Sequence, residues 1–329
     1  MISHWILAAR IQTLPVSLCP VILGLSLSLT SSHYSPLRAV MIIGCVILIQ
    51  LGTNFANDYV DFIKGADTSD RVGPTRMTQS GAIQPKTMKW ASIMAFTGAF
   101  ILGIPLIING GWPILVIGLL AIFFGVIYTA GPYALAYIGG AEIITYLFFG
   151  PISVWGTYYL QTGVWNHSLG VIGSGIGLIT AAILVVNNTR DMASDAKVNK
   201  KTWAVRFGRT FSTIEYIVFL YAPIFILDAI TPDTFSQIIL VLFLVVVAMI
   251  LTRRFTRAKD QQFNRLLGLT SIYLILYTSM AVYLLTLHAR SFRHLYYRYI
   301  HPKDRIDHYG CDPATTIVYG ASSNMAGRI

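Results

Sequence analysis

Long apolar segments with few charged residues are the feature of this sequence that most restricts its fold. About nine such segments follow one another, and each holds roughly 20 residues, enough to cross a bilayer as a helix. The sequence therefore predicts an all-α polytopic membrane protein with about nine transmembrane helices. The expected spans are 5–30, 38–61, 89–108, 112–130, 139–160, 168–191, 211–230, 234–252 and 266–288.

The composition agrees with a membrane protein. The chain has 329 residues, of which 55% are hydrophobic and 12% are charged. The charged fraction is about half that of a typical soluble domain. The net charge of +10 could indicate nucleic acid, but the basic residues lie in short loops between apolar segments, so we expect no nucleic acid partner. Cys19, Cys45 and Cys311 do not suggest a disulfide framework.

The distribution of positive charge predicts the orientation in the membrane. Lysine and arginine follow spans two, six and eight, whereas the intervening loops 109–112, 161–168 and 228–234 hold almost none. The positive-inside rule then places the N-terminus and the basic loops in the cytoplasm, with the bilayer as a partner. The cell's inner (plasma) membrane is the expected location.

The C-terminal tail does not follow this rule. We expect a transmembrane domain at 1–288 and a separate basic tail of unknown role at 289–329. After nine spans the tail should lie outside, although it is rich in lysine and arginine. Either one span is miscounted, or the earlier loops dominate the orientation.

A polar helical face follows the second apolar segment. Asn54, Asn57, Asp58 and Asp61 are spaced at i, i+3, i+4 and i+7, so they share one face of a helix. Ionisable groups in a membrane segment usually mark a function, and carboxylate and amide oxygens suit Mg²⁺ or another divalent cation. The alternative is a helix end that reaches into water.

A second acidic face ends the sixth span. Asn188, Asp191 and Asp195 are spaced at i, i+3 and i+7, and a basic loop follows, as it does after the first face. Two facing aspartate clusters repel unless cations lie between them, and such cations would recruit a diphosphate. The basic residues expected to hold it are Lys64, Arg71, Arg76, Arg190, Lys200 and Lys201.

A diphosphate held in this way is an activated leaving group. If it is attached to an allylic chain, its departure leaves a resonance-stabilised carbocation that an electron-rich acceptor can capture. The cations would stabilise the charge on the diphosphate, with Asp61 and Asp191 as the central catalytic carboxylates. The competing interpretations are an intramembrane ion-pair network, a non-catalytic scaffold and a cation-coupled transporter, although transporters usually place such groups near the bilayer midplane.

With both acidic faces located, the chain resembles the UbiA superfamily of intramembrane aromatic prenyltransferases. The resemblance covers roughly 1–288 and rests on the stretches 8–24, 54–83, 128–161 and 187–208, together with the nine-span layout. The spacing of 54–83 resembles the branch that prenylates 1,4-dihydroxy-2-naphthoate to give demethylmenaquinone, diphosphate and CO₂. Acceptors such as 4-hydroxybenzoate, or a haem or chlorophyll precursor, remain alternatives.

The resemblance also implies a helical bundle around a central cavity between the two acidic faces, and roles for individual residues. A polyprenyl diphosphate and the aromatic acceptor would occupy the cavity. Tyr128 would be catalytic, steadying the allylic cation with its ring face, and Arg10 and Glu142 would face the cavity or the acceptor. Asn54 and Asp58 would support the substrate site. The implied metal ligands are Asn57, Asp61, Asp67, Asp191 and Asp195.

The chain departs from the family pattern at three places. It has GGAE at 139–142 where the family commonly has GLGE, Asn199 where glycine is common, and Ile11 where proline is common. None of these changes touches an expected metal ligand. They bear on the shape of the loops and on the fit of the acceptor.

Overall fold

The computed structural model describes residues 2–65, 72–128, 135, 139–231 and 234–287. Helices and loops account for all of these residues, and no strand occurs among them. All of the helices lie in the compact unit Met1–His288. They are α1 Ile2–Ala9, η1 Ile11–Thr13, α2 Leu14–Ser28, α3 Pro36–Ile63, α4 Pro85–Gly110, α5 Trp112–Ile127, α7 Ala141–Phe148, α8 Pro151–Thr162, α9 Ser168–Lys197, α10 Trp203–Ile230, α11 Phe235–Arg257 and α12 Gln262–Leu287.

The predicted all-α membrane fold is confirmed, and the count of nine spans is approximate. Within the described part of the chain, seven helical segments are long and apolar enough to cross a membrane. The fourth predicted span is the shorter α5, with 16 residues. The fifth is divided into α7 and α8, and the first is interrupted by η1.

The helices begin where the sequence supplies capping residues. The Ser35 side chain accepts a hydrogen bond from the backbone N–H of Arg38, with Pro36 at the first helical position of α3. Thr234 and Gln237 form a reciprocal capping box at the start of α11. Such side chains satisfy backbone N–H groups that have no partner within the helix.

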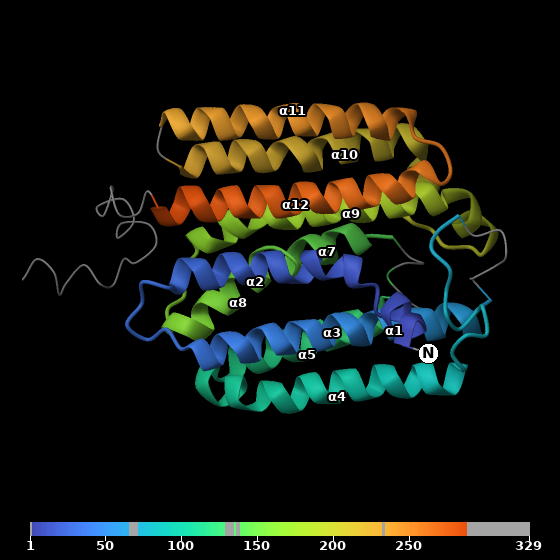
Figure 1. Ribbon diagram of the computed structural model, residues 1–329, viewed down its shortest axis with the longest axis horizontal. Coiled ribbons are helices and arrows are strands. Elements are labelled where there is room, and N and C mark those ends of the chain that lie inside the picture. Colours follow the sequence, from blue (N-terminus) through green and yellow to red (C-terminus); the bar gives the residue numbers. More distant parts are fainter. Residues whose placement is uncertain (1, 66–71, 129–134, 136–138, 232–233, 288–329) are drawn as a thin grey trace, which may run out of the picture. The chain divides into compact units, whose positions relative to one another are not determined.

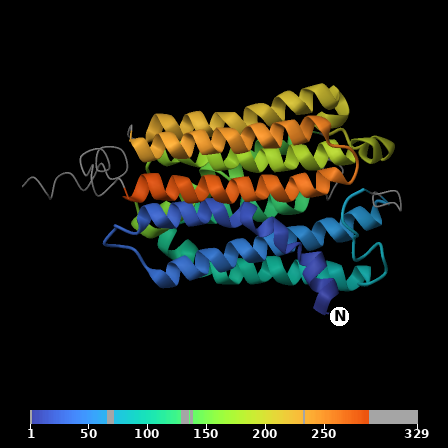
Figure 2. The ribbon, with the colours of Figure 1, turned by 45° about the horizontal axis from the view of Figure 1, so that its top comes forward.

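The long helices lie side by side in the unit that contains them (Figures 1 and 2). Helix α3 packs most extensively on α4, and α9 packs on α10, while α2 contacts α8 and α12. The C-terminal ends of α3, α5 and α9 lie at the same end, on the right in Figure 1. This arrangement brings the two acidic sequence motifs, which are more than a hundred residues apart, to one end of the bundle.

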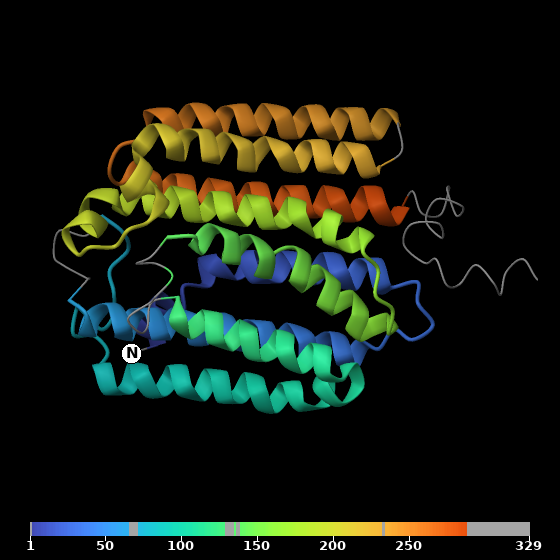
Figure 3. The ribbon, with the colours of Figure 1, turned by 180° about the vertical axis from the view of Figure 1, so that it is seen from behind.

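Glycine allows α7 and α8 to approach α9 closely. Seen from behind, α7 and α8 run between α5 and α9 (Figure 3). A Cβ atom at Gly150, between the two short helices, would lie 2.7 Å from the carbonyl oxygen of Gly173 and 2.8 Å from the amide nitrogen of Gly177. Small residues four positions apart are a common means of close helix contact in membranes, and here they fix α7 against α9.

This contact leads to a stability prediction. We expect Gly177→Ala to destabilise the fold by about 1–3 kcal/mol, because the new Cβ would collide with the carbonyl oxygen of Tyr146. The thermal unfolding midpoint of the purified protein in detergent should fall accordingly. Gly170→Ala is the matched control on the same helix, because a Cβ there meets no atom within 4 Å. Equal midpoints for the two variants would contradict the proposed close contact.

Candidate functional site

A cavity of about 660 Å³ lies between α3 and α9, and both acidic motifs line it. Its wall on α3 runs from Asp61 to Ile42, a distance of about 28 Å at 1.5 Å per residue. One end is polar and the other is lined by buried aliphatic side chains. These aliphatic residues include Ile42, Leu106, Ile114 and Leu160. The predicted central cavity between the acidic faces is therefore present.

Asp61 is the most enclosed carboxylate at the polar end, with 2% of its surface exposed. Arg76 donates a hydrogen bond from Nη2 to its Oδ2 at 2.9 Å. Lys200 Nζ lies 3.5 Å from its Oδ1, but that oxygen accepts no hydrogen bond from the described residues. A buried carboxylate needs such compensation, because a charge in a low-dielectric interior is costly.

Lys200 links the two acidic motifs. Its ammonium lies 3.8 Å from Oδ1 of Asp195 as well as near Asp61. The turn that carries it is closed by a hydrogen bond of 2.9 Å from the Lys200 amide to the carbonyl oxygen of Asp195. Asn199 has a φ of 57° in this turn, a left-handed conformation that asparagine tolerates better than most residues.

Arg190 holds the second acidic motif. It donates two hydrogen bonds to the Asp191 carboxylate, each of 2.7 Å. Its other contacts are the amide oxygens of Asn187 and Asn264, both at 2.8 Å. Asn264 in turn donates to the carbonyl oxygen of Val72 at 3.1 Å. One guanidinium therefore ties α9 to α12, and through Asn264 to the segment that leads to Arg76.

Asp58 supports the loop that carries Arg76. Its carboxylate accepts hydrogen bonds from the backbone N–H groups of Met77 at 3.1 Å and Thr78 at 2.9 Å. Asp58 is buried and does not line the cavity, unlike Asn57 and Asp61 on the same helix. The predicted supporting role of Asp58 at the substrate site stays a prediction, and the geometry favours a role through the loop.

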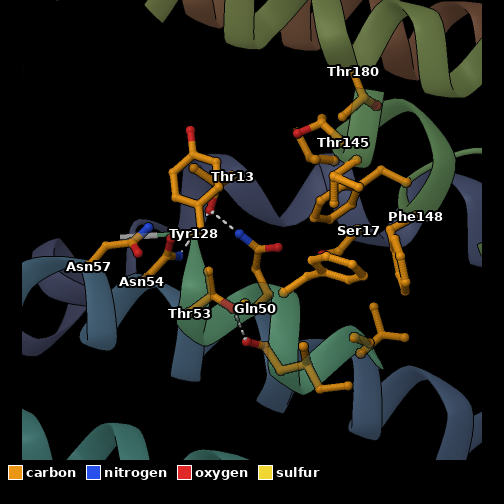
Figure 4. A pocket seen from close by; sticks show the side chains of 18 of the residues that line it. Thr13, Ser17, Gln50, Thr53, Asn54, Asn57, Tyr128, Thr145, Phe148 and Thr180 are labelled. Carbon is orange, nitrogen blue, oxygen red and sulfur yellow. Dashed lines mark hydrogen bonds between the residues drawn. The ribbon is translucent and has the colours of Figure 1, made fainter. Parts of the chain in front are cut away.

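The break between α1 and α2 positions Arg10 at the cavity. Arg10 has a φ of 49°, which is unusual for a residue other than glycine. Asn54 stabilises this break by donating to the carbonyl oxygen of Ala9 at 2.8 Å and to Thr13 Oγ1 at 3.1 Å. Gln50 donates to the same hydroxyl at 3.2 Å, as Figure 4 shows.

Of four further expected residues, one lines the cavity and three do not. Tyr128 lines it at the end of α5 (Figure 4). Glu142 does not line it, and instead accepts a hydrogen bond of 2.7 Å from Asn188, which does. Lys64 and Lys201 are exposed and do not line the cavity either. The pKa of Lys64 lies below its ordinary value because of partial burial and the nearby Lys200, although Asp61 opposes the shift.

Most of the expected site residues therefore meet around one cavity. Asp67 and Arg71 lie outside the described residues. The expected residues that line the cavity are Arg10, Asn54, Asn57, Asp61, Arg76, Tyr128, Arg190, Asp191, Asp195 and Lys200.

The sequence profile of the UbiA prenyltransferase family matches residues 17–267. The chain belongs to this family. It is 36% identical to the 1,4-dihydroxy-2-naphthoate octaprenyltransferase of Haemophilus influenzae over 67% of this chain and 74% of that protein. The protein of the same description from Escherichia coli is 35% identical, over 62% and 68% of the two chains. Human UbiA prenyltransferase domain-containing protein 1 is 29% identical over 80% and 78%.

A solved structure has the same fold. It is a UbiA homolog from Archaeoglobus fulgidus bound to DMAPP and Mg²⁺, with a TM-score of 0.62 and 14% identity. The match covers 85% of this chain and 99% of that one. At this identity the likeness establishes the shared fold of a UbiA membrane protein.

The donor groups of the cavity fit a metal that is completed by a phosphate ligand. In the described part of the chain, no three histidine, cysteine or acidic side chains are grouped closely enough to hold a metal ion by themselves. Asp61 nevertheless has a buried oxygen that accepts no hydrogen bond there. Mg²⁺ commonly takes one or two carboxylates and completes its coordination with substrate phosphates. Asn57, Asp61, Asp191 and Asp195 all line the cavity and carry oxygen donors of this kind.

Several polar residues of the site were not among the expected ones. Asn187, Asn188 and Ser194 line the cavity on α9, and Asn264 lines it on α12. Asn187 and Asn188 precede Asp191 by four and three residues, so helical spacing alone could have indicated both as site residues. Asn264 has no comparable signal, because only the packing of α12 on α9 brings it to Arg190.

The support that Asp58 gives to the Arg76 loop can be tested without an activity assay. We expect Asp58→Ala to destabilise the protein by about 1–3 kcal/mol, because two buried backbone N–H groups lose their acceptor. Hydrogen exchange of the Met77 and Thr78 amides should become faster than in the wild type. Asp58→Asn keeps one acceptor oxygen and should give a smaller effect. Unchanged exchange in Asp58→Ala would show that the loop does not depend on this carboxylate.

Proposed function

We propose that this protein is an integral-membrane enzyme that transfers a polyprenyl group from its diphosphate to 1,4-dihydroxy-2-naphthoate. One observation carries the proposal. A single cavity has two acidic motifs and several cationic side chains at one end and a long aliphatic wall at the other. A polyprenyl diphosphate is divided in the same way, because it joins an ionic headgroup to a long hydrocarbon chain. The relatives described as 1,4-dihydroxy-2-naphthoate octaprenyltransferases support the choice of acceptor.

The polar end would bind the diphosphate of the donor. Asn57, Asp61, Asp191 and Asp195 would hold Mg²⁺ or another divalent cation, with Asp67 as a further predicted ligand. When bound, the metal would neutralise charge that develops on the departing diphosphate. Arg76 and Lys200 now contact the Asp61 carboxylate, so they are close enough to exchange that partner for phosphate oxygens.

Aromatic side chains would protect the allylic cation. Tyr128 and Phe124 are one turn apart at the end of α5, and the Phe124 and Phe148 rings have centroids 5.1 Å apart. All three line the cavity. Aromatic ring faces attract cations more strongly where water is excluded. Their position next to the polar end suits a carbocation formed at the carbon that loses the diphosphate.

Capture of the cation completes the proposed reaction. The bond between the allylic carbon and the diphosphate oxygen breaks, and its electron pair leaves with the diphosphate. A ring carbon of the acceptor then forms a bond to the allylic carbon, and the carboxylate at that ring position departs as CO₂. The electron pair of the broken bond to the carboxylate restores the aromatic ring, so no oxidant is required.

We further propose the cell's inner (plasma) membrane as the location, with the N-terminus and the acidic-motif loops in the cytoplasm. The positive-inside rule supports this orientation, because the loops after α3, α9 and α11 are basic. Residues 1–288 would form the catalytic domain. Residues 289–329 would form a separate basic tail.

The direct test is an assay of the purified protein with octaprenyl diphosphate, 1,4-dihydroxy-2-naphthoate and Mg²⁺. We expect prenylated product, identified by its mass, together with released diphosphate and CO₂. Chelation of the metal should abolish the reaction. Asp61→Asn and Asp191→Asn should each lower kcat by at least about 100-fold, since each removes charge stabilisation of the leaving group.

Two outcomes would contradict this proposal in different ways. Product formed on 4-hydroxybenzoate but not on the naphthoate would replace the acceptor and keep the reaction class. Cation uptake into vesicles without release of diphosphate would instead support a transporter. The position of the acidic groups at helix ends favours the enzyme, because transporter sites usually lie near the bilayer midplane.

The aliphatic end of the cavity leads to a prediction about the chain length of the prenyl diphosphate. Gly118 lines the cavity on α5, ten residues before Tyr128, which is about 15 Å along the helix axis. A Cβ there would meet no atom within 4 Å, so Gly118→Phe should fold and fill part of the cavity. We expect kcat/KM for octaprenyl diphosphate to fall about tenfold or more, with little change for geranyl diphosphate.

The matched control for donor length is Gly170→Phe. Gly170 is a helical glycine with equal space around its Cβ, but it does not line the cavity. Its donor preference should equal that of the wild type. An unchanged preference in Gly118→Phe would show that the prenyl chain does not run along this part of α5.

A further inference from the structure

Two adjacent asparagines on α9 are held by opposite ends of their side-chain amides. Asn187 accepts a hydrogen bond of 2.8 Å at Oδ1 from Nη2 of Arg190. Asn188 donates a hydrogen bond of 2.7 Å from Nδ2 to Oε1 of Glu142. Both asparagines line the cavity. Their neighbours therefore determine which part of each amide remains for a ligand.

The chemistry of these neighbours fixes the two amide orientations. A guanidinium only donates hydrogen bonds, so Arg190 must face the oxygen of Asn187. The Glu142 carboxyl accepts at Oε1, so it faces the nitrogen of Asn188. Asn187 thus retains its N–H₂ donors, whereas the carbonyl oxygen of Asn188 is left to accept. Adjacent residues of the same type consequently offer different hydrogen-bonding groups to the cavity.

The two orientations suit different ligands. Phosphate oxygens are acceptors, so they match the amide N–H₂ of Asn187 and are repelled by a carbonyl oxygen. A hydroxyl group can donate to the Asn188 oxygen. Asn187 and Asn188 precede Asp191 by four and three residues on the same helix, or about 6 Å and 4.5 Å along its axis. Both therefore lie beside the acidic motif, and their hydrogen-bond partners rather than their depth distinguish them.

We propose that Asn188, oriented by Glu142, binds a ring hydroxyl of the aromatic acceptor, and that Asn187 faces the diphosphate of the donor. The proposal rests on the prenyl transfer proposed above and assigns the polar groups of its two substrates. Glu142 acts as a positioning residue, because it reaches the cavity only through Asn188. It is 2% exposed, and α7 holds it against α9.

Glu142 variants separate this hydrogen bond from a role of the carboxylate charge. Glu142→Gln keeps an oxygen that accepts from Asn188, so the KM for 1,4-dihydroxy-2-naphthoate should stay within about twofold of the wild type. Glu142→Leu removes the acceptor and should raise that KM about tenfold, the factor that corresponds to about 1.4 kcal/mol. The KM for octaprenyl diphosphate should change less than twofold in both variants.

The paired asparagine variants test the division between the substrates. Asn188→Leu should raise the KM of the acceptor about tenfold, and Asn187→Leu should raise the KM of the donor instead. Gln237→Leu is the control for loss of a buried hydrogen-bonding side chain, because Gln237 lies on α11, donates to Asp228 and does not line the cavity. Its KM values should match those of the wild type.

A binding measurement keeps the test independent of turnover. Titration calorimetry of the purified full-length protein would compare 1,4-dihydroxy-2-naphthoate with 2-naphthoate, which lacks both hydroxyl groups. Wild type and Glu142→Gln should bind the dihydroxy compound about tenfold more tightly, and Glu142→Leu and Asn188→Leu should lose that preference. A preference that survives in Asn188→Leu, or equal impairment of Glu142→Gln and Glu142→Leu, would overturn the inference.

The outcomes also distinguish this inference from the proposed function. If the wild type forms the prenylated product but the preference for the hydroxyl compound does not depend on Asn188, prenyl transfer stands and the assignment of Asn188 fails. If the wild type forms no prenylated product with 1,4-dihydroxy-2-naphthoate or with 4-hydroxybenzoate, the proposed reaction fails. A hydroxyl preference that disappears in Asn188→Leu would then still establish the binding site.

Discussion

The need to neutralise two facing carboxylate clusters governs the polar end of this molecule. Asp61 on α3 and Asp191 and Asp195 on α9 come from distant parts of the chain, and the fold brings them to one cavity. Arg76, Arg190 and Lys200 compensate their charge. Because these cations can equally bind phosphate, the same electrostatic requirement that stabilises the fold prepares it for an anionic substrate.

The supporting contacts show how this balance is maintained. Asp58 fixes the loop that presents Arg76, and Asn264 on α12 fixes Arg190. Asn54 holds the break that directs Arg10 to the cavity. Each of these interactions joins protein groups only, so the fold itself positions Arg76, Arg190 and Arg10 around the cavity.

The sequence predicted the helical membrane fold and the cavity because both depend on simple periodic signals. Apolar runs identify spans, and aspartates at helical spacing identify a polar face. Contacts between distant helices could not be predicted in this way, because they depend on how the helices pack. The sequence placed Glu142 near the acceptor, but its contact with Asn188 follows from the approach of α7 to α9 through Gly150, Gly173 and Gly177. Likewise, Asp58 and Asp61 share a helical face, yet only the fold shows that one supports a loop and the other lines the cavity.

The division of one predicted span into α7 and α8 has a consequence for how relatives of this protein can diverge. The acidic residues lie on α3 and α9, whereas Glu142, Thr145 and Phe148 lie on the short α7. Substitutions on α7 can therefore reshape one wall of the cavity while the carboxylates and their counter-ions keep their positions. In the proposed reaction, changes on α7 would alter the acceptor side of the cavity directly at Thr145 and Phe148, and indirectly through the contact of Glu142 with Asn188, while the acidic residues of α3 and α9 stay in place.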